Sequence, residues 1–370
     1  MYSKAALSAI FAFVAIGASA SAAQTCAELS QRNAELIQSG IGGRGLPEEC
    51  LPEPKTFALK HTTAPQALQE LATVLRTVLD VQNVTIDQAT SSVTVHASTE
   101  QLALTDWLVR ELNAPPPVAS MRNVPVEQMT VPLSAQSGKL APDQAVRVFF
   151  LAHTNTPQGI QEILTTLRTV ADVQKVFNFT AQNALVVRAD GPQMAATAFM
   201  IAALDIAPGA GKDSPDFQYN PANAPSSEVK VFYMKHATSP QGVQQILTAL
   251  RTVGGIMKVF NNTGPMAITV RGTATEIASS EWLIQALDVA ADAHPTNGQY
   301  RIPGAKPSED TIQVFYPGAQ TTPAGLQKVV AQLRAQMPDM KVASFATPSA
   351  VIVRGSPDQI VQSAQAIREQ

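Results

Sequence analysis

Few residues in this sequence could carry catalysis or bind a cofactor. The 370 residues include 2 cysteines, 5 histidines and 5% aromatic side chains. No hydrolase elbow, phosphate-binding loop, H-E-x-x-H or paired-cysteine motif occurs, and the serines and aspartates are not grouped with a candidate base. We therefore predict a protein that is not an enzyme and that uses no cofactor.

The chain also has no excess of basic residues over acidic ones. The 26 lysines and arginines are outnumbered by 29 aspartates and glutamates, which gives a formal net charge of −3. Removal of an N-terminal leader that contains Lys4 would make this charge −4. Because a mildly acidic chain is not attracted to phosphate backbones, we expect no nucleic-acid partner.

Long apolar runs are absent except at the N-terminus. Residues 1–22 combine Lys4, an apolar run over 5–16 and two overlapping Ala-x-Ala sites. This pattern is typical of a signal peptide, and its apolar core is too short to span a bilayer. Thr25 is larger than the residue expected before a lipidated cysteine. The sequence thus predicts a soluble protein exported to the periplasm or beyond, without a transmembrane segment after removal of the leader.

The two cysteines lie close together in an N-terminal segment, residues 23–55. Cys26 and Cys50 flank a short helical stretch and a Gly-rich turn. In an exported chain such a pair most simply forms a disulfide, and neither cysteine belongs to a redox C-x-x-C motif. Closing this loop would stabilise the segment by roughly 3 kcal/mol on the chain-entropy account.

Internal repetition dominates the rest of the chain. Pro65, Pro157, Pro240 and Pro323 are 92, 83 and 83 residues apart, and other positions recur with the same spacing. No insertion or deletion therefore occurs inside a copy. The units span 56–114, 146–206, 229–289 and 312–370, and they are joined by Pro-rich connections over 115–145, 207–228 and 290–311.

Periodicity predicts a β-α-β-β-α order in each unit. In the third unit the first helix begins at Pro240, with Thr238 or Ser239 as N-cap, and carries an apolar stripe through Leu250. The Gly254-Gly255 pair ends it. The second helix opens with a capping box of Thr273 and Glu276. The matching pairs are Ser98 with Gln101, Asp190 with Gln193, and Ser356 with Gln359.

The predicted fold class is therefore α+β, with four tandem units. We expect each unit to be a three-stranded sheet with two helices on one face, and to have its own core near the lower size limit. The strand order stays open, with a right-handed crossover to a parallel partner as the default. The other sheet face would be free for partners. The Pro-rich connections should be semi-rigid, and Tyr219 and Tyr300 within them should pack on a neighbouring unit.

These units resemble the short ring-forming N-terminal domains of bacterial secretins. The resemblance is carried by the hydrophobic first strand, by LRT in the first helix, and by AITVRGTATEI or AVIVRGSPDQI from last strand to last helix. It implies the domain fold and a place in type II or III secretion or type IV pilus systems. Secretins continue into a β-rich pore segment. This sequence stops at Gln370 without one, so it resembles the periplasmic part alone.

Two functions fit this interpretation. The first is an assembly protein of the cell envelope, peripheral at the outer membrane, that binds secretin-like or other envelope proteins or copies of itself. The second is a periplasmic module that binds cell-wall glycan or peptide, because a fold does not fix a function.

Three recurring sets of polar residues are candidate site residues. The first set, at one position on the first helix, has two interpretations. Either these side chains are solvated and their charge interacts favourably with the helix dipole, or they contact an adjacent unit or subunit. The members of this set are Arg76, Arg168, Arg251 and Arg334.

The second set closes the third strand and comprises His96, Arg188, Arg271 and Arg354. We expect these side chains to be exposed, with bridges to carboxylates of the following helix as the alternative. The third set ends the first strand and comprises His61, His153 and His236. The fourth unit has Ala319 there, and no further ligands lie at metal spacing, so we predict structural histidines and no metal site.

Overall fold

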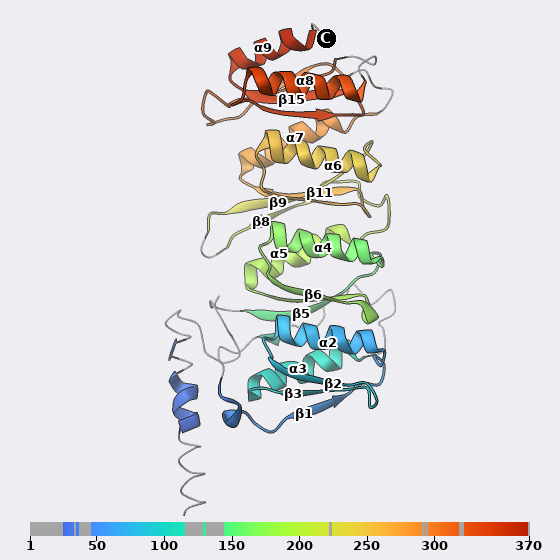
Figure 1. Ribbon diagram of the computed structural model, residues 1–370, viewed down its shortest axis with the longest axis vertical. Helices are drawn as coiled ribbons and strands as arrows, with labels where there is room; N and C mark the ends of the chain where they lie inside the picture. The colour runs from blue at the N-terminus through green and yellow to red at the C-terminus, as the bar shows by residue number, and fades with distance from the viewer. Residues whose placement is uncertain are drawn as a thin grey trace, which may run out of the picture. The chain divides into compact units, whose positions relative to one another are not determined.

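A computed structural model of the chain describes residues 25–32, 35–36, 46–114, 129–130, 144–221, 224–290, 293, 295–317 and 322–368. Figure 1 labels its helices and strands. The predicted leader, residues 1–22, lies outside the described residues. Within the described ranges, no helix has the length and apolar character needed to cross a bilayer.

All four repeats contain the predicted strands and helices. The first has β1 (Lys55–Ala58), α2 (Pro65–Val78), β2 (Asn83–Asp87), β3 (Ser92–His96) and α3 (Thr99–Leu112). The second has β5 (Ala145–Phe150), α4 (Pro157–Val170), β6 (Lys175–Phe179), β7 (Ala184–Ala189) and α5 (Gly191–Leu204). The third has β9 (Ser227–Tyr233), α6 (Pro240–Ala249), β10 (Lys258–Asn262), β11 (Ala267–Gly272) and α7 (Ala274–Leu287). The fourth has β13 (Thr311–Phe315), α8 (Pro323–Gln336), β14 (Lys341–Phe345), β15 (Ala350–Gly355) and α9 (Pro357–Arg368).

Local sequence signals place the helix ends as expected. Ser239, rather than Thr238, is the N-cap of α6, and its hydroxyl accepts a hydrogen bond from the Gly242 amide. A π-helical turn, η5 (Leu250–Gly254), continues α6, and Gly255 follows it in the left-handed conformation at φ 76°. The capping boxes that open α3 and α7 are both formed. Side-chain hydrogen bonds to orphan amides thus fix where these helices begin.

Within each sheet, the third strand of the repeat is central and pairs antiparallel with the other two. In the first repeat the order is β1-β3-β2, so β1 and β2 are parallel but not adjacent. The expected crossover to a paired parallel strand is therefore wrong. The helix between β1 and β2 carries the chain across β3.

Three of the four sheets contain a fourth strand, which lies in a segment predicted to be a connection. These strands are β4 (Met129–Thr130), β8 (Asp216–Tyr219) and β12 (Gly298–Arg301), and each pairs antiparallel with the first strand of its repeat. The prolines and glycines of these connecting segments had indicated loops instead of strands. The two connection tyrosines pack on the preceding repeat as predicted. The Tyr219 hydroxyl donates to Ala171 O at 3.5 Å, and the Tyr300 ring lies 5.5 Å from Trp282.

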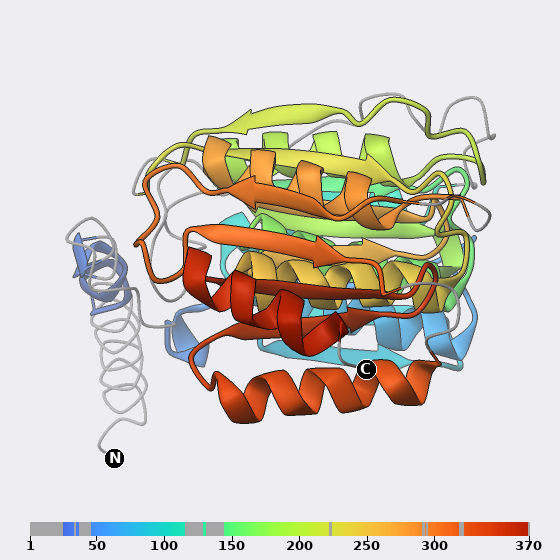
Figure 2. The same cartoon turned by 90° about the horizontal axis from the view of Figure 1, so that it is seen from above.

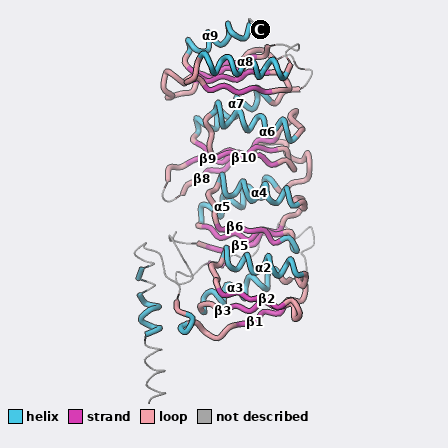
Figure 3. The backbone as a smooth tube through the Cα atoms, viewed as in Figure 1, coloured by secondary structure: helices cyan, strands magenta, loops and turns pink. Residues whose placement is uncertain are grey.

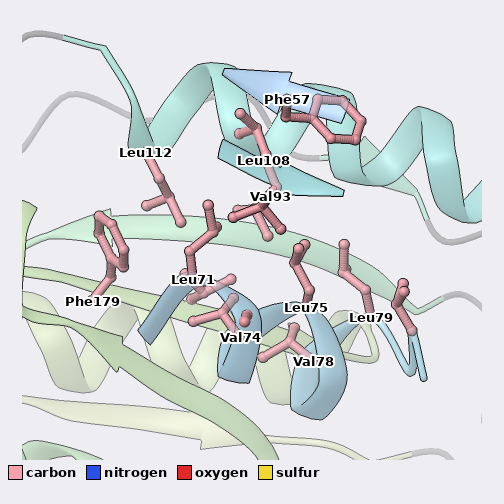
Figure 4. Packing of buried hydrophobic residues seen from close by; sticks show 14 of the residues in the cluster. Phe57, Leu71, Val74, Leu75, Val78, Leu79, Val93, Leu108, Leu112 and Phe179 are labelled. Atoms are coloured by element: carbon pink, nitrogen blue, oxygen red, sulfur yellow. The ribbon is translucent and has the colours of Figure 1, made fainter. Parts of the chain in front are cut away.

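The described residues form two compact units whose division runs through the second repeat. The first unit extends to Phe150 and also includes Lys175–Gly191, so it contains the sheet of the second repeat. In it, α2 and α3 lie between two sheets (Figure 3). Leu71, Val74 and Val78 of α2 share one apolar cluster with Phe179 of β6 (Figure 4). The first helix of one repeat thus packs against the sheet of the next.

The second compact unit repeats this arrangement twice. It holds α4, most of α5, and everything described after them. Its first sheet, β10-β11-β9-β8, lies between α4 and α5 on one face and α6 and α7 on the other (Figure 1). Its second sheet, β12-β13-β15-β14, is covered by α6 and α7 and, on the opposite face, by α8 and α9, which run side by side (Figure 2).

The predicted free face is therefore covered in the sheets of the second, third and fourth repeats. The cores are also shared, because Ile246 and Leu250 of the third repeat lie in one apolar cluster with Ile312 and Phe345 of the fourth. A single repeat does not contain all the partners of its own apolar surface. Each repeat accordingly depends on its neighbours, as in a solenoid.

An isolated third repeat should consequently not fold cooperatively. A fragment of residues 226–290 loses α4 from one face of its sheet and the fourth sheet from the outer face of α6. We expect a broad, non-cooperative melt when its helical circular dichroism is followed with temperature. A fragment of residues 224–370, which keeps one complete junction, is the control and should melt more cooperatively. A sharp transition in the shorter fragment would contradict the shared-core interpretation.

Candidate interaction surfaces

A charge cluster around Asp80 closes the junction between the first and second repeats. Asp80 follows α2 with φ 57°, a left-handed conformation that aspartate and asparagine adopt more readily than most residues. Its Oδ2 accepts hydrogen bonds from Lys175 Nζ and, at 2.8 Å, from Arg188 Nη1. The Arg188 side chain is only 2% exposed, and it also donates to Val78 O at 3.2 Å. Burial lowers the pKa of Lys175 and Arg188, and the Asp80 carboxylate opposes that shift.

The second junction repeats the cluster in a more exposed setting. Asp172, again left-handed at φ 58°, binds Lys258 and, at 2.6 Å, Arg271. Its side chain is 43% exposed. Partial burial raises the pKa of Asp172, but the hydrogen bonds from Lys258 and Arg271 outweigh it and hold that pKa below its ordinary value.

In the third junction, Gly255 stands where the other two have aspartate. Arg354 approaches so closely that a Cβ on Gly255 would lie 3.1 Å from its Nη1. That nitrogen donates to Gly254 O at 2.9 Å, and thus to the negative end of the helix. The carboxylate comes instead from Glu309, 3.1 Å from Lys341 Nζ, whose hydrogen bond and charge lower the pKa of Glu309.

The arginines that close the third strands are therefore not bound to the following helix. Arg188, Arg271 and Arg354 all reach back to the end of the first helix in the preceding repeat. The prediction that these side chains are exposed is also wrong, because the first helix of the preceding repeat covers them. Long arginine side chains can satisfy carbonyls and a carboxylate together, which suits a covered charge.

A second contact fixes each junction near the start of the first helix. Glu70 accepts from the backbone amide of Thr180 at 2.7 Å and from its hydroxyl at 2.6 Å. Glu162 receives the same two donors from Thr263. In the third junction Gln245 accepts only the Ala346 amide, at 3.0 Å.

Tyrosine hydroxyls add a third contact in the second unit. Tyr233 donates to Ala203 O at 2.7 Å, and Tyr316 donates to Ala286 O. Both acceptors lie in the second helix of the preceding repeat. Burial raises the pKa of both tyrosines, so they remain neutral donors at physiological pH.

The outer helix face of the fourth repeat lacks the residues that form these junctions. Lys328 replaces the acceptors Glu70, Glu162 and Gln245, and lysine has no acceptor. Gln332 and Gln336 stand where the first repeat has buried Val74 and Val78, and Gln336 is exposed. Pro338 stands at the position of Asp80. The last repeat therefore presents a polar helix face, as the terminal repeats of stacked proteins do.

The outer sheet face of the first repeat is polar in the same way. Thr56, Thr94 and Asp87 stand where the second repeat has the buried Val148, Val186 and Phe179. The Lys–Arg pair is replaced by Asn83 and His96, which are register partners. Neither terminal face carries the groups that join one repeat to another, so neither fits a further repeat of this kind.

The predicted disulfide lies beside this first sheet. Cys26 and Cys50 are bonded, with their Cα atoms 5.3 Å apart. Cys50 ends a short 3-10 turn, η1 (Glu48–Cys50), whose Glu48 Oε1 lies 3.3 Å from His96 Nδ1. The N-terminal segment is thus held at the corner of the sheet where later repeats place their arginine.

The recurring arginines of the first helices lie at the exposed edges of the sheets. Arg76 donates to Val84 O at 2.6 Å, Arg251 to Val259 O at 2.8 Å, and Arg334 to Val342 O at 2.9 Å. Each acceptor belongs to the second strand of the same repeat, which is an edge strand. One guanidinium nitrogen is thus used to cover an edge carbonyl, a common protection of open sheet edges. All four side chains, Arg168 included, remain exposed.

Exposed residues around these arginines recur more faithfully than the buried residues beneath them. In the first three repeats, five exposed or half-exposed positions after the first proline of the helix carry the same residue, whereas half-exposed Glu70 and Glu162 become Gln245, and buried Val74 becomes Thr166 and then Ala249. We name this face the helix-1 strip. It comprises Gln66, Gln69, Thr73, Arg76 and Thr77 with their equivalents Gln158, Gln161, Thr165, Arg168 and Thr169, and Gln241, Gln244, Thr248, Arg251 and Thr252.

The recurring histidines have exposed side chains, and their backbone amides help to hold the loop between the first strand and the first helix. The backbone amide of His61 donates to Asn113 Oδ1 at 3.0 Å, and those of His153 and His236 donate to Asp205 and Asp288 at 2.9 and 2.8 Å. Asn113, Asp205 and Asp288 all follow a second helix. No three His, Cys, Asp or Glu side chains among the described residues are grouped as metal ligands.

No protein family and no curated protein sequence matches this chain. Solved structures similar to it include Aeromonas hydrophila ExeD, at 13% identity and TM-score 0.15, with 82% of this chain and 59% of that one covered. XcpQN012 is 13% identical at TM-score 0.21, with 64% and 100% covered. The secretin GspD of the type II secretion system in E. coli K12 is 12% identical at TM-score 0.15, with 82% and 58% covered. The chain spans about 59% of the length of ExeD, and these scores are too low to establish a common fold or function.

Proposed function

We propose that this chain is a non-catalytic assembly protein of the cell envelope that binds protein partners through its helix-1 strip. The partners would be copies of itself or secretin-like envelope proteins, in a secretion or pilus machine. The proposal extends the sequence resemblance to secretin N-terminal domains and the signal-peptide pattern of residues 1–22.

The observation that carries the proposal is the identity of the strip across three repeats. Core packing explains why buried positions stay apolar, but it does not require Gln69, Gln161 and Gln244 to be the same. Each strip also presents one arginine, a residue enriched at protein interfaces because its forked donors bind carboxylates and carbonyls together. The two terminal faces are polar and lack the junction residues. We therefore expect partners to bind the sides of the repeats, where the helix-1 strip lies.

Substituting the strip of the second compact unit, together with its fourth-repeat equivalents Gln327 and Arg334, tests this proposal. Replacement of Arg168, Arg251 and Arg334 by alanine should preserve helix content, since alanine is the better helix former. Self-association, or binding to a purified secretin periplasmic region, should weaken by more than the ~1 kcal/mol that exposed ion pairs explain. Analytical ultracentrifugation over a range of concentrations is the measurement, with circular dichroism as the folding check.

A second triple variant separates binding from protection of the sheet edge. Replacement of Gln161, Gln244 and Gln327 by alanine leaves every arginine in place and should also weaken association. Gln285→Ala, an exposed change on α7, is the matched control and should have no effect. Unchanged sedimentation in both triple variants, together with retention of the protein on purified cell wall, would favour the glycan-binding alternative.

A further inference from the structure

One junction contains a buried polar pair where the other two are apolar. The Thr166 hydroxyl of α4 lies 3.0 Å from Asn262 Oδ1 of β10 and 2.9 Å from Glu162 O of its own helix, and it shares its one proton between these acceptors. Thr166 and Asn262 are 0% and 1% exposed. The equivalent residues are Val74 and Phe179 in the first junction and Ala249 and Phe345 in the third. Each of these belongs to the apolar cluster of its unit. We infer that the Thr166–Asn262 pair is a specificity determinant, which we name the address. It favours packing of α4 and α5 on the third sheet over packing on any other sheet.

The cost of mispairing follows from burial. If α2 of the first repeat packed on the third sheet, Val74 would face Asn262, whose side-chain carbonyl would lose its hydrogen-bond donor. Asn262 Nδ2 already has no hydrogen-bond partner among the described residues, and Thr269 Oγ1, 0% exposed on a neighbouring strand, has none there either. An additional unsatisfied buried group would disfavour the wrong pair roughly five- to a hundredfold.

The charge cluster and the carboxylate–threonine contact do not distinguish the first junction from the second. Both have an aspartate bound by lysine and arginine, and both have a glutamate bound by a threonine. The third junction differs at both places, with Glu309 and with Gln245 facing Ala346. The Tyr233 hydroxyl, which has Phe150 at its place in the first junction, bonds a backbone carbonyl that any helix layer offers. The polar pair is therefore the side-chain-to-side-chain contact that separates the second junction from the first among the contacts described. Specificity of this kind uses a polar group that is satisfied only by the correct partner.

Erasing the address should leave the protein stable but allow the repeats of two molecules to pair incorrectly. The double variant T166V/N262F gives the second junction the residues of the first. Replacing a buried polar pair with apolar residues is often neutral or stabilising. We expect refolding from denaturant at high protein concentration to give a fraction of dimer, joined by a helix layer on the wrong sheet, roughly five- to a hundredfold above that of the wild type. Size-exclusion chromatography with light scattering measures it.

The matched control moves the address instead of removing it. V74T/F179N combined with T166V/N262F keeps one polar pair, now in the first junction, and should refold with the wild-type dimer fraction. T166V/N262L is a second variant without the polar pair, for use if phenylalanine is too large for the site. Its dimer fraction should match that of T166V/N262F. An erased variant that refolds with no more dimer than the wild type would overturn the inference. So would a V74T/F179N/T166V/N262F variant that forms as much dimer as T166V/N262F.

Discussion

Asp80→Gly should destabilise the first compact unit by roughly 3–5 kcal/mol, the cost of leaving a buried charge without its partner. The Arg188 guanidinium, 2% exposed, would keep its carbonyl contact but lose the carboxylate, with the Lys175 charge beside it. Glycine is the right replacement because it adopts the left-handed conformation without strain, and Gly255 already occupies the equivalent position. The expected loss therefore reports the charge cluster and not the backbone.

Asp172→Gly is the matched comparison. The same change in the second junction should cost only about 1 kcal/mol, because the Asp172 side chain is 43% exposed and water screens the pair. The two tryptophans allow the units to be followed separately, since Trp107 lies in the first unit and Trp282 in the second. Urea unfolding of Asp80→Gly in a Trp282→Phe background, followed by Trp107 fluorescence, reports the stability of the first unit. Equal losses for the two variants would show that burial does not set the strength of these clusters.

Leu250→Ala should cost roughly 2–5 kcal/mol in the second unit. Leu250 is 0% exposed, and it lies in a cluster that includes residues of the third and fourth repeats. The cavity would therefore weaken the packing of the third repeat against the fourth as well as its own core. Trp282 fluorescence during urea unfolding is the measurement, in a Trp107→Phe background.

Gln244→Ala serves as the control for this substitution. Gln244 lies on the exposed side of the same helix and should change the unfolding free energy by less than ~0.5 kcal/mol. If both variants lost the same stability, the apolar stripe would have been assigned to the wrong helix face. If Leu250→Ala cost less than ~1 kcal/mol, the packing around η5 would be looser than its burial indicates.

Much of each repeat could be predicted because its signals are local. Pro240 with the Ser239 cap, Gly255 in its left-handed position, and the Thr273–Glu276 box each act within a few residues, so their spacing fixes helix ends. The α+β class and the four-unit organisation follow from these signals and their strict recurrence. The disulfide was predictable because only two cysteines exist in the chain.

The junction residues were missed, although the sequence contains a signal for them. Asp80 and Asp172 recur at a helix end, and Lys175, Lys258 and Lys341 recur at the start of a strand, each opposite an arginine in register. A single repeat gives these charges no partner, so the sequence predicted the arginines to be exposed and assigned no role to the aspartates and lysines. Comparison with the first repeat, where Asn83 and His96 replace the pair, would have suggested that the partner lies in a preceding repeat.

By itself the sequence determined the repeat length, the order of strands and helices, the helix ends and the apolar stripe of the first helix. These features depend on side chains within one turn or on periodicity along one segment. Only the tertiary structure decided that a helix also packs on the next sheet, that connection segments add a fourth strand, and that Arg188 is buried rather than exposed. The physical reason is that burial and charge pairing here join residues about 100 positions apart, such as Arg188 with Asp80, and no local pattern states which distant surface will cover them.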